Sequence, residues 1–286
     1  MTQSFNLSII GSGVMARGVA LVALLAGCPV RVWARRTESA KACRQSMDEA
    51  LMQSVEKGKI TGEQREIHLR NLSVTMDLSE ACSGADLVLE SVAEDLQVKQ
   101  DLFVKLARVA PENAVLATNT SSLSVREIAV ASGAPERVLG LHFFNPPVAM
   151  KLLELVVPDE TDPHVESRAR AFAEVLGRTV IRVKDSPGFA TSRLSVCIGL
   201  EAARMVEEGV ASAADIDTAM EIGYRHPMGP LKLGDHVGLD VRLAVADEIH
   251  RRLGREAFKA PAIMRHLVKA GKLGKKTGEG FHFWVR

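Results

Sequence analysis

The sequence predicts an α/β protein in which a doubly wound, mostly parallel sheet is followed by a smaller all-α domain. Three observations lead to this prediction. An apolar run at residues 7–10 enters a glycine-rich turn and then an apolar helix. Short apolar strands and helical segments then alternate as far as residue 183. Beyond the turn at Pro187-Gly188 the apolar spacing is almost entirely helical, so the domains are expected at residues 1–185 and 186–286.

The glycine-rich turn has the spacing G-x-G-x-x-(G/A) between a strand and a helix, which is typical of a Rossmann-type dinucleotide-binding domain. Gly11 permits the tight turn, Gly13 leaves the backbone open to a pyrophosphate, and Ala16 allows helix and strand to pack closely. The helix N-terminus adds free N–H groups and the positive end of its dipole. We therefore expect a cofactor to contact Gly11, Gly13, Val14, Met15 and Ala16.

The second strand, at residues 30–36, lacks the acid that would hold the ribose diol of NAD, and ends instead in Ala34-Arg35-Arg36. Without a carboxylate, discrimination against a 2′-phosphate is lost, and Arg35 or Arg36 can bind that phosphate in bidentate fashion. The cofactor is thus NAD or NADP, and these arginines favour NADP. In the alternative, both arginines are solvated and NAD binds through its other contacts.

The remaining elements follow in order along the chain. In the first domain, helices are expected at residues 38–58, 61–69, 96–109, 125–131 and 164–176, and strands at 72–75, 86–92, 114–119, 137–144, 151–157 and 180–183. Thr61 and Gln64 fit a capping box. In the second domain, helices are expected around residues 194–205, from 215, at 237–253 and at 261–270.

Composition excludes several classes of protein. The chain is 47% hydrophobic and 25% charged with a formal net charge of +1, whereas a nucleic-acid binder needs a basic face. No apolar run reaches transmembrane length, and the N-terminus has no signal-peptide pattern. The four cysteines form no C-x-x-C pair, and no His/Cys cluster has metal-ligand spacing. We expect a cytoplasmic protein with free thiols that binds no nucleic acid, membrane or metal.

Two polar stretches at predicted strand ends could carry chemistry. His142 ends one apolar strand and Glu154 lies in the next, so they could form a general base and its orienting group, or be a packed histidine and an unrelated surface glutamate. Asn119-Thr120-Ser121-Ser122 follows a buried strand. Its hydroxyls could reach a substrate oxygen or cap the next helix.

Motifs in a fixed order extend over essentially the whole chain. In the first part they are Gly11-x-Gly13-x-Met15 with Arg17-Gly18, Glu90-x-x-x-Glu94 with Lys99, Asn119-Thr120-Ser121-Ser122, His142-Phe-Phe-Asn145-Pro146, Lys151-Leu-Leu-Glu154 and Ser186-Pro187-Gly188-Phe189. Later come Gly223-Tyr224-x-His226-Pro227-Met228-Gly229-Pro230, Gly238-Leu239-Asp240 and Gly274-Lys275-Lys276-Thr277-Gly278-Glu279-Gly280-Phe281. On these motifs the sequence resembles the L-3-hydroxyacyl-CoA dehydrogenases, which include bacterial 3-hydroxybutyryl-CoA dehydrogenases.

The resemblance implies reversible oxidation of an L-3-hydroxyacyl-CoA to a 3-ketoacyl-CoA, a reaction of fatty acid metabolism and β-oxidation. It makes His142 the general base, Glu154 the group that orients the imidazole, and Ser121 a hydrogen-bond donor to the reacting oxygen. Ser192 stands where the family has an asparagine at the mouth of the second domain, and it is expected to be a site residue.

The resemblance also implies the binding residues. Further contacts to the cofactor are expected from Glu94, Lys99, Asn119, Ser121, Asn145 and Lys276. Lys57 and Lys59 lie where the family holds the CoA nucleotide, although a solvated helix end explains them equally well. The helical domain is expected to form a homodimer interface, and the site is expected between the two domains.

Two other functions share most of these motifs. One is a dehydrogenase of a hydroxy acid without CoA, such as L-gulonate. The other is a non-catalytic dinucleotide-binding protein of the lambda-crystallin kind, against which the intact Ser121, His142 and Glu154 argue.

Overall fold

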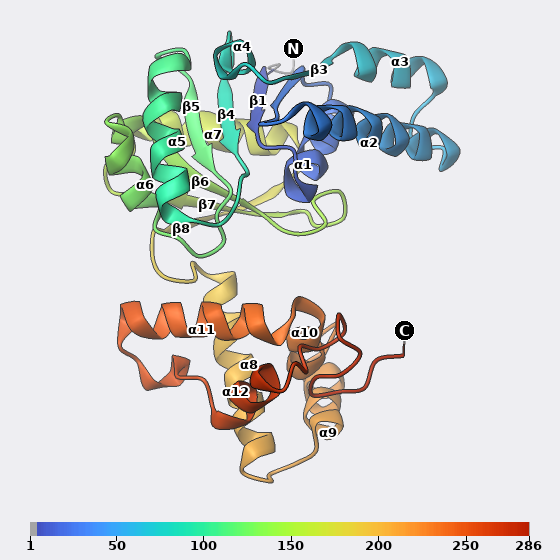
Figure 1. Cartoon of the computed structure of the whole chain (residues 1–286), viewed down its shortest axis with the longest axis vertical. Coiled ribbons are helices and arrows are strands. Elements are labelled where there is room, and N and C mark those ends of the chain that lie inside the picture. Colours follow the sequence, from blue (N-terminus) through green and yellow to red (C-terminus); the bar gives the residue numbers. More distant parts are fainter. Residues whose placement is uncertain (1–4, 286) are drawn as a thin grey trace. The chain divides into compact units, whose positions relative to one another are not determined.

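The computed structural model describes residues 5–285 and divides the chain into two compact units, Met1–Ser186 and Pro187–Arg286 (Figure 1). The division lies one residue beyond the boundary expected from the sequence. None of the described helices is both long and apolar enough to cross a bilayer.

The first unit is built on an eight-stranded sheet with the order β3-β2-β1-β4-β5-β6-β7-β8. The strands are β1 Leu7–Ile10, β2 Val30–Trp33, β3 Leu72–Thr75, β4 Leu87–Glu90, β5 Val115–Thr118, β6 Val138–Phe143, β7 Leu152–Val157 and β8 Thr179–Lys184. Neighbouring strands are parallel except for β6 and β7, which are antiparallel. The predicted doubly wound, mostly parallel sheet of a Rossmann-type domain is confirmed.

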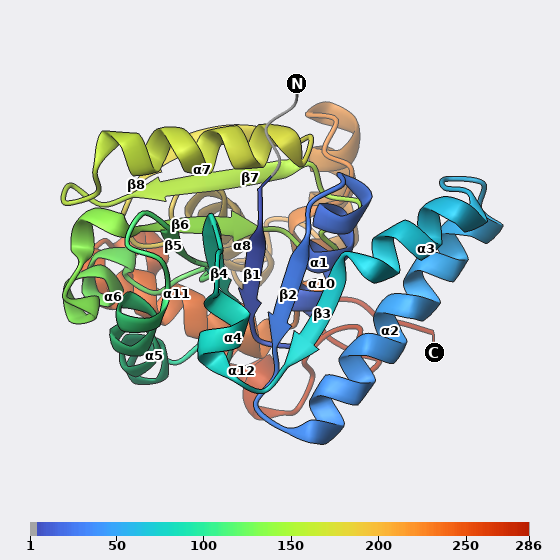
Figure 2. The same cartoon turned by 90° about the horizontal axis from the view of Figure 1, so that it is seen from above.

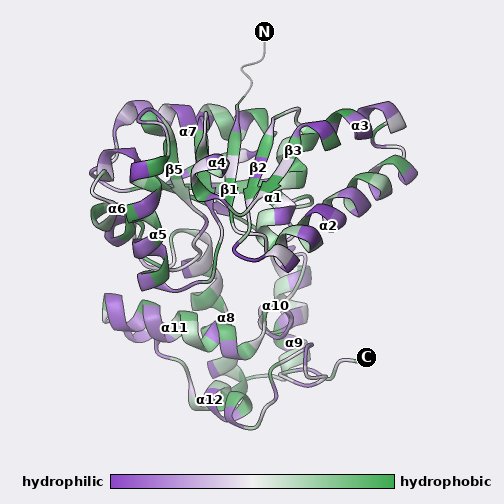
Figure 3. Cartoon of the chain, turned by 45° about the horizontal axis from the view of Figure 1, so that its top comes forward, coloured by the Kyte–Doolittle hydropathy of each residue, from purple (hydrophilic) through white to green (hydrophobic). Residues whose placement is uncertain are grey.

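Helices cover both faces of this sheet. They are α1 Val14–Leu25, α2 Thr37–Glu56, α3 Gly62–Arg70, α4 Leu78–Cys82, α5 Leu96–Val109, α6 Val125–Ser132 and α7 Pro163–Val175, with a 3₁₀ turn, η1, at Pro135–Arg137. Apolar side chains of α1, α2 and α7 share one core with the strands, and those of α4, α5 and α6 share another. Helix α7 runs along β7 and β8 (Figure 2). The strands are mostly hydrophobic, whereas α3 is mostly hydrophilic and buries no residue (Figure 3).

Local sequence signals explain most boundaries, and three predictions need correction. The capping box of Thr61 and Gln64 is present at the start of α3. The second strand ends at Trp33, because Arg36 already serves as the N-cap residue of α2. The first helix was expected at residues 19–26 but begins at Val14, directly after the glycine turn. Helix α4 was not predicted, although the Asp77 carboxylate caps it at the N–H groups of its first turn.

The second unit is helical, as predicted. Its helices are α8 Thr191–Glu207, α9 Ala213–Thr218, a π-helical turn η2 Ala219–Gly223, α10 Pro230–Val237, α11 Leu239–Leu253, a 3₁₀ turn η3 Glu256–Phe258 and α12 Ala262–Lys269. The helix expected at 237–253 corresponds to α11, which begins two residues later, whereas the preceding helix α10 was not predicted. Gly238 adopts φ +104°, a conformation that favours glycine, and separates α10 from α11.

Two buried aspartates fasten the C-terminal segment to the helices of this unit. The Asp235 carboxylate accepts hydrogen bonds from the backbone N–H groups of Phe281 and His282 and from the Trp284 indole. The Asp217 carboxylate accepts two backbone N–H groups at the start of α10 and contacts His282 Nε2 at 2.7 Å. The chain beyond α12 is therefore held by buried carboxylates and largely by backbone donors.

Candidate active site

The glycine turn between β1 and α1 has the geometry of a phosphate cradle. Gly11 has φ +127°, and a Cβ there would lie 2.3 Å from the carbonyl oxygen of Ser91, so only glycine fits. Gly13 is exposed, and a Cβ on it would meet no described atom within 4 Å. No side chain caps α1 and its first turn has no acid, so its free N–H groups suit an anionic group such as a pyrophosphate.

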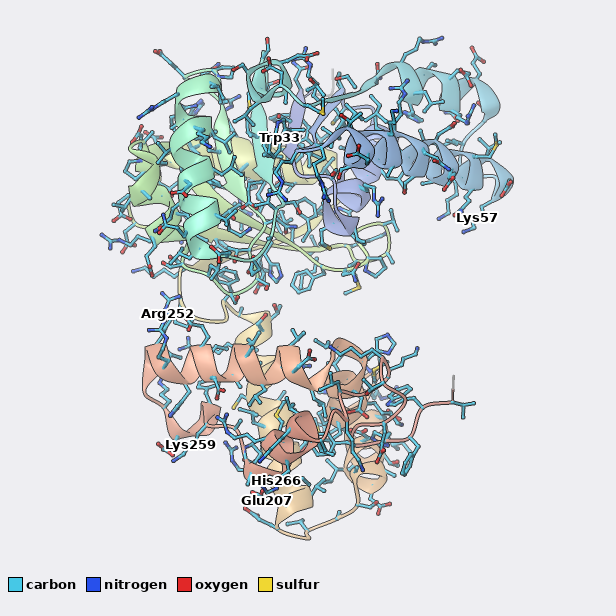
Figure 4. The ribbon with its side chains drawn as sticks, viewed as in Figure 1. Trp33, Lys57, Glu207, Arg252, Lys259 and His266 are labelled. Carbon is cyan, nitrogen blue, oxygen red and sulfur yellow. The ribbon has the colours of Figure 1, made fainter. Side chains whose placement is uncertain are left out.

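The end of β2 presents two cations at the surface. Ala34 is buried, while Arg35 and Arg36 are exposed and form no ion pair with another residue in the range 5–285. Trp33 precedes them, and its indole Nε1 donates to the Met76 carbonyl at 3.0 Å (Figure 4). A carboxylate is therefore absent from the described end of β2, as the sequence indicated, and two guanidinium groups are available there.

His142 and Glu154 form a buried acid–imidazole pair in the first unit. The two residues are directly opposite each other on β6 and β7, and Nδ1 lies 2.7 Å from Glu154 Oε2. Glu154 is 0% exposed and His142 is 7% exposed. The interpretation as a packed histidine with an unrelated surface glutamate is wrong. The pair results from the antiparallel register of β6 and β7, and not from converging ends of parallel strands.

This contact determines which nitrogen of His142 is basic. An ionised carboxylate only accepts hydrogen bonds, so Nδ1 carries the hydrogen and Nε2 holds the lone pair of the neutral ring. The Phe144 ring lies against the imidazole, with centroids 4.5 Å apart. The imidazole is thus fixed in tautomer and orientation.

A buried ion pair supports the neighbouring strand end. Lys99 Nζ of α5 donates to both oxygens of Glu90, at 2.7 and 2.9 Å, and the two side chains are 1% and 0% exposed. Glu90 also accepts from the backbone N–H of Val92 and the hydroxyl of Thr118. Four hydrogen bonds therefore balance the desolvation of this carboxylate.

The same lysine connects this pair to the loop of Ser121. Lys99 Nζ lies 3.4 Å from Glu94 Oε2. The other oxygen of Glu94 accepts from the Thr120 hydroxyl at 2.6 Å and from the Ser121 N–H at 3.0 Å. Partial burial alone would raise the pKa of Glu94, but the Lys99 ammonium and hydrogen bonds from the loop hold this pKa below its ordinary value. The chain Glu90–Lys99–Glu94 thus holds the backbone at Ser121.

Asn119 links the same loop to the histidine strand. Its Oδ1 accepts from the Phe143 N–H at 2.9 Å, next to His142, and its Nδ2 donates to Ser91 Oγ at 3.4 Å. Asn145 lies exposed in the loop after β6. The structure therefore gathers Asn119, Ser121 and His142 at neighbouring strand ends.

A groove in the first unit contains the two lysines expected near CoA. Lys57 follows α2 at its outer end (Figure 4). Together with Lys59 it lines the groove, whose other walls are the C-terminal part of α1, the loop after β6 and the end of α7. Arg178 also lines it and donates to the carbonyl oxygens of Pro147 and Met150 at 2.9 and 2.7 Å. The groove thus combines three cations with apolar walls, among them Leu25 and Val148.

The remaining predicted residues belong to the second unit. Ser192 lies in the first turn of α8. Lys276 donates to both oxygens of Asp240, at 2.6 and 2.7 Å. Residues 5–285 contain no group of three His, Cys, Asp or Glu side chains that could hold a metal ion.

One functional residue received no role from the sequence. Glu90 lies at the centre of the network, and its signal was a lone carboxylate at the end of the apolar run of β4. Lys99 was expected along the cofactor, but its enclosed ammonium has Glu90 and Glu94 as partners.

Comparisons with known proteins match both units. Residues 6–186 match the family described as 3-hydroxyacyl-CoA dehydrogenase, NAD binding domain, and residues 188–284 match its C-terminal domain. A 3-hydroxybutyryl-CoA dehydrogenase of Mycobacterium tuberculosis is 41% identical over 279 residues, which cover 97% of each chain. A probable 3-hydroxybutyryl-CoA dehydrogenase of Bacillus subtilis is 38% identical over 277 residues, covering 97% of this chain and 96% of the relative.

A solved structure gives the same result. The crystal structure of (S)-3-hydroxybutyryl-CoA dehydrogenase from Ralstonia eutropha has a TM-score of 0.95 and 30% identity, and covers 99% of this chain and 100% of that one. Both the sequence and the fold of the present chain are therefore similar to these dehydrogenases.

Proposed function

Since the chain belongs to the 3-hydroxyacyl-CoA dehydrogenase family, we propose that it interconverts L-3-hydroxyacyl-CoA and 3-ketoacyl-CoA by hydride transfer with a nicotinamide cofactor. The observation that carries the proposal is the buried 2.7 Å contact between His142 Nδ1 and Glu154. It gives the imidazole one basic nitrogen and a fixed counter-charge, which is what a general base for a hydroxyl proton needs.

The proton moves between the substrate oxygen and His142. In oxidation, the C3 hydroxyl gives its proton to Nε2, and a bound nicotinamide would accept the hydride from C3. The imidazolium that forms is stabilised by Glu154, whose enclosure at 0% exposure strengthens the attraction between the charges. In reduction the imidazolium returns the proton to the developing alkoxide. The hydroxyl of Ser121 donates a hydrogen bond to the same oxygen.

A bound nicotinamide would supply the hydride acceptor or donor, and the cradle at residues 11–16 suits its pyrophosphate. Val14, at the start of α1, is exposed beside Gly13. Asn145 and Lys276 are proposed as further contacts. Glu94 is 39% exposed and can contact the cofactor itself, whereas Lys99, at 1%, acts through Glu94. We therefore treat Lys99 as a positioning residue for the Ser121 loop.

We propose NADP as the cofactor, with NAD as the alternative. Two exposed guanidinium groups after a buried Ala34 support a 2′-phosphate site, because arginine binds phosphate in bidentate fashion. CoA is proposed to lie in the groove with Lys57 and Lys59, whose cations suit its phosphates and whose apolar walls suit its pantetheine chain.

A homodimer through the helical unit and a cytoplasmic location complete the proposal. The dimer is supported by apolar side chains of α8, α10 and α11 that are 38–65% exposed, namely Leu194, Ile198, Val237 and Val241. The four free cysteines support a reducing compartment. The reaction itself fits fatty acid metabolism, including β-oxidation.

Reduction of acetoacetyl-CoA tests the function, with NADPH and NADH compared by kcat/KM. Turnover with higher kcat/KM for NADPH is the expected result. Preference for NADH would overturn the NADP proposal alone. Oxidation of L-gulonate with no turnover of acetoacetyl-CoA would replace the CoA substrate. Cofactor binding without turnover of either compound would indicate a non-catalytic binding protein.

A further inference from the structure

Arg178 connects the groove of the first unit to the loop between β6 and β7. It stands directly before β8, and its Nη1 donates to the carbonyl oxygens of Pro147 and Met150 at 2.9 and 2.7 Å. Among residues 5–285, no carboxylate forms an ion pair with Arg178, and burial lowers the pKa of its guanidinium. The described chain therefore holds this cation with two neutral acceptors and supplies no counter-charge for it.

The loop held by Arg178 joins the two strands that form the buried acid–imidazole pair. It begins after Phe143, the neighbour of His142, and ends before Leu152. Asn145, a proposed cofactor contact, lies exposed in this loop. A shift of the loop would therefore move a proposed cofactor contact that lies three residues after the general base.

A second contact of the loop is with helix α1, which begins at the cofactor cradle. A Cβ on Gly18 would lie 2.8 Å from the ring of Pro147, so this buried ring packs directly on the helix. Gly18 belongs to the Arg17-Gly18 motif, to which the proposed mechanism gives no role. Pro147 is thus held by the cofactor helix through its ring and by Arg178 through its carbonyl oxygen.

The groove beside Arg178 has room for an anionic ligand. Its volume of about 440 Å³ lies within the range of about 300–1,000 Å³ that small-molecule sites occupy. Lys57, Lys59 and Arg178 line it, Val148 of the loop forms part of its wall, and none of its described lining residues is acidic. The Nη2 atom of Arg178 has no acceptor among residues 5–285, so it remains available to a ligand.

We propose that Arg178 is a positioning residue that couples the binding of the CoA phosphates in the groove to the position of the loop between β6 and β7. This inference rests on the proposed function, in which the CoA nucleotide lies in the groove. A phosphate beside the guanidinium supplies the missing counter-charge and fixes the donor of the two hydrogen bonds to Pro147 and Met150. Binding energy from the remote nucleotide is thereby expressed in kcat, and not only in KM.

A truncated substrate tests this coupling. Acetoacetyl-CoA and the acetoacetyl thioester of N-acetylcysteamine carry the same reacting group, but the second compound lacks every phosphate. For the unmodified enzyme we expect kcat to be higher with acetoacetyl-CoA by about tenfold, the range of one charge-assisted hydrogen bond. Arg178→Met should bring the two kcat values to within about twofold of each other.

Matched variants separate coupling from binding. Lys57 is exposed and has no hydrogen bond to the loop among residues 5–285, so Lys57→Met should raise the KM for acetoacetyl-CoA and keep the ratio of kcat values. Arg182→Met is the control, because Arg182 lies nearby on β8 in a pair with Glu166 outside the groove, and it should change neither quantity. Arg178→Lys should keep part of the ratio, because an ammonium keeps the charge but not the planar fork of donors.

Four outcomes contradict the proposal. An equal fall of kcat with both substrates in Arg178→Met would reduce Arg178 to a structural support of the loop. A higher KM for acetoacetyl-CoA with an unchanged kcat ratio would make it a binding residue only. Equal kcat values for the two substrates in the unmodified enzyme would overturn the coupling, and all three results leave the proposed function intact. Absence of turnover with both thioesters would overturn the proposed function together with the inference.

Discussion

Two buried carboxylates of the first unit, Glu90 and Glu154, differ in their partners from Asp235 of the second unit. In the first unit, Glu90 faces the Lys99 ammonium and Glu154 faces the His142 imidazole. In the second unit, Asp235 accepts two backbone N–H groups and an indole N–H. The Lys99 ammonium carries a charge and the His142 imidazole acquires one when it takes up a proton, whereas backbone N–H groups stay neutral. The first pattern suits proton transfer and charge placement, and the second suits fixing the course of the chain.

The imidazole pair should show the largest effect in this comparison. His142→Gln keeps a polar side chain opposite Glu154 but removes the basic nitrogen. We expect kcat with acetoacetyl-CoA to fall by about 10²–10⁴, the usual contribution of a general base. Thermal unfolding measured alongside should change far less than the rate. A variant that keeps more than a tenth of the activity would rule out His142 as the base.

Substitutions in the Glu90–Lys99 pair distinguish a role in stability from a role in positioning the Ser121 loop. Lys99→Met leaves the Glu90 carboxylate buried without its cation, which should cost about 3–5 kcal/mol of unfolding free energy. Adding Glu90→Gln removes the stranded charge and should recover most of that loss. Because Glu94 still lacks Lys99 in the double variant, we expect kcat to remain low.

Denaturant unfolding and steady-state kinetics on the two single variants and the double variant check this prediction. Recovery of both stability and kcat in the double variant would mean that the pair is only structural.

Substitution of Asp235 should lower the stability of the protein and leave kcat unchanged. Asp235→Asn replaces an acceptor-only carboxylate by an amide and weakens the three hydrogen bonds that hold the C-terminal segment, at a cost of about 1–3 kcal/mol. We expect a lower thermal midpoint and earlier proteolysis of the C-terminal segment. At a temperature where the variant is folded, kcat should match the unmodified enzyme. A large loss of kcat in the fully folded variant would show that the comparison between the units is too simple.

The smallest expected effect is the contribution of Glu94 to the pH dependence of the free energy of unfolding. Its folded-state pKa is lower than its ordinary value of 4.5, so between the two values the unfolded chain binds more protons than the folded one. The contribution of Glu94 to stability is therefore complete above about pH 4.5 and is lost as the pH falls through the lowered pKa. Unfolding measured from pH 6 to pH 3 should show a shallower acid loss for Glu94→Gln. Parallel curves for the two proteins would contradict the assignment.

Much of this architecture can be predicted from residue patterns. The glycine turn and the apolar runs identify the sheet, and Thr61 with Gln64 identifies a helix start. Strand direction is not encoded in those runs, so the antiparallel β6–β7 pair was missed. Helix α10 was missed, although the helix that follows Gly238 was predicted to within two residues of its start. Lys99 was placed at the cofactor because the family resemblance implied it. Lysine is rarely enclosed, and only its two acidic partners explain why it is enclosed here.

The antiparallel register of β6 and β7 has a consequence for how the chain matures. Side chains alternate between the faces of a strand, so a slip of one residue would carry Glu154 to the opposite face from His142. The His142–Glu154 pair therefore forms only when β7 pairs with β6 in the correct register. A misaligned molecule could retain its cofactor cradle on β1 and still be inert, which makes enzymatic activity a reporter of faithful strand pairing at the far side of the sheet.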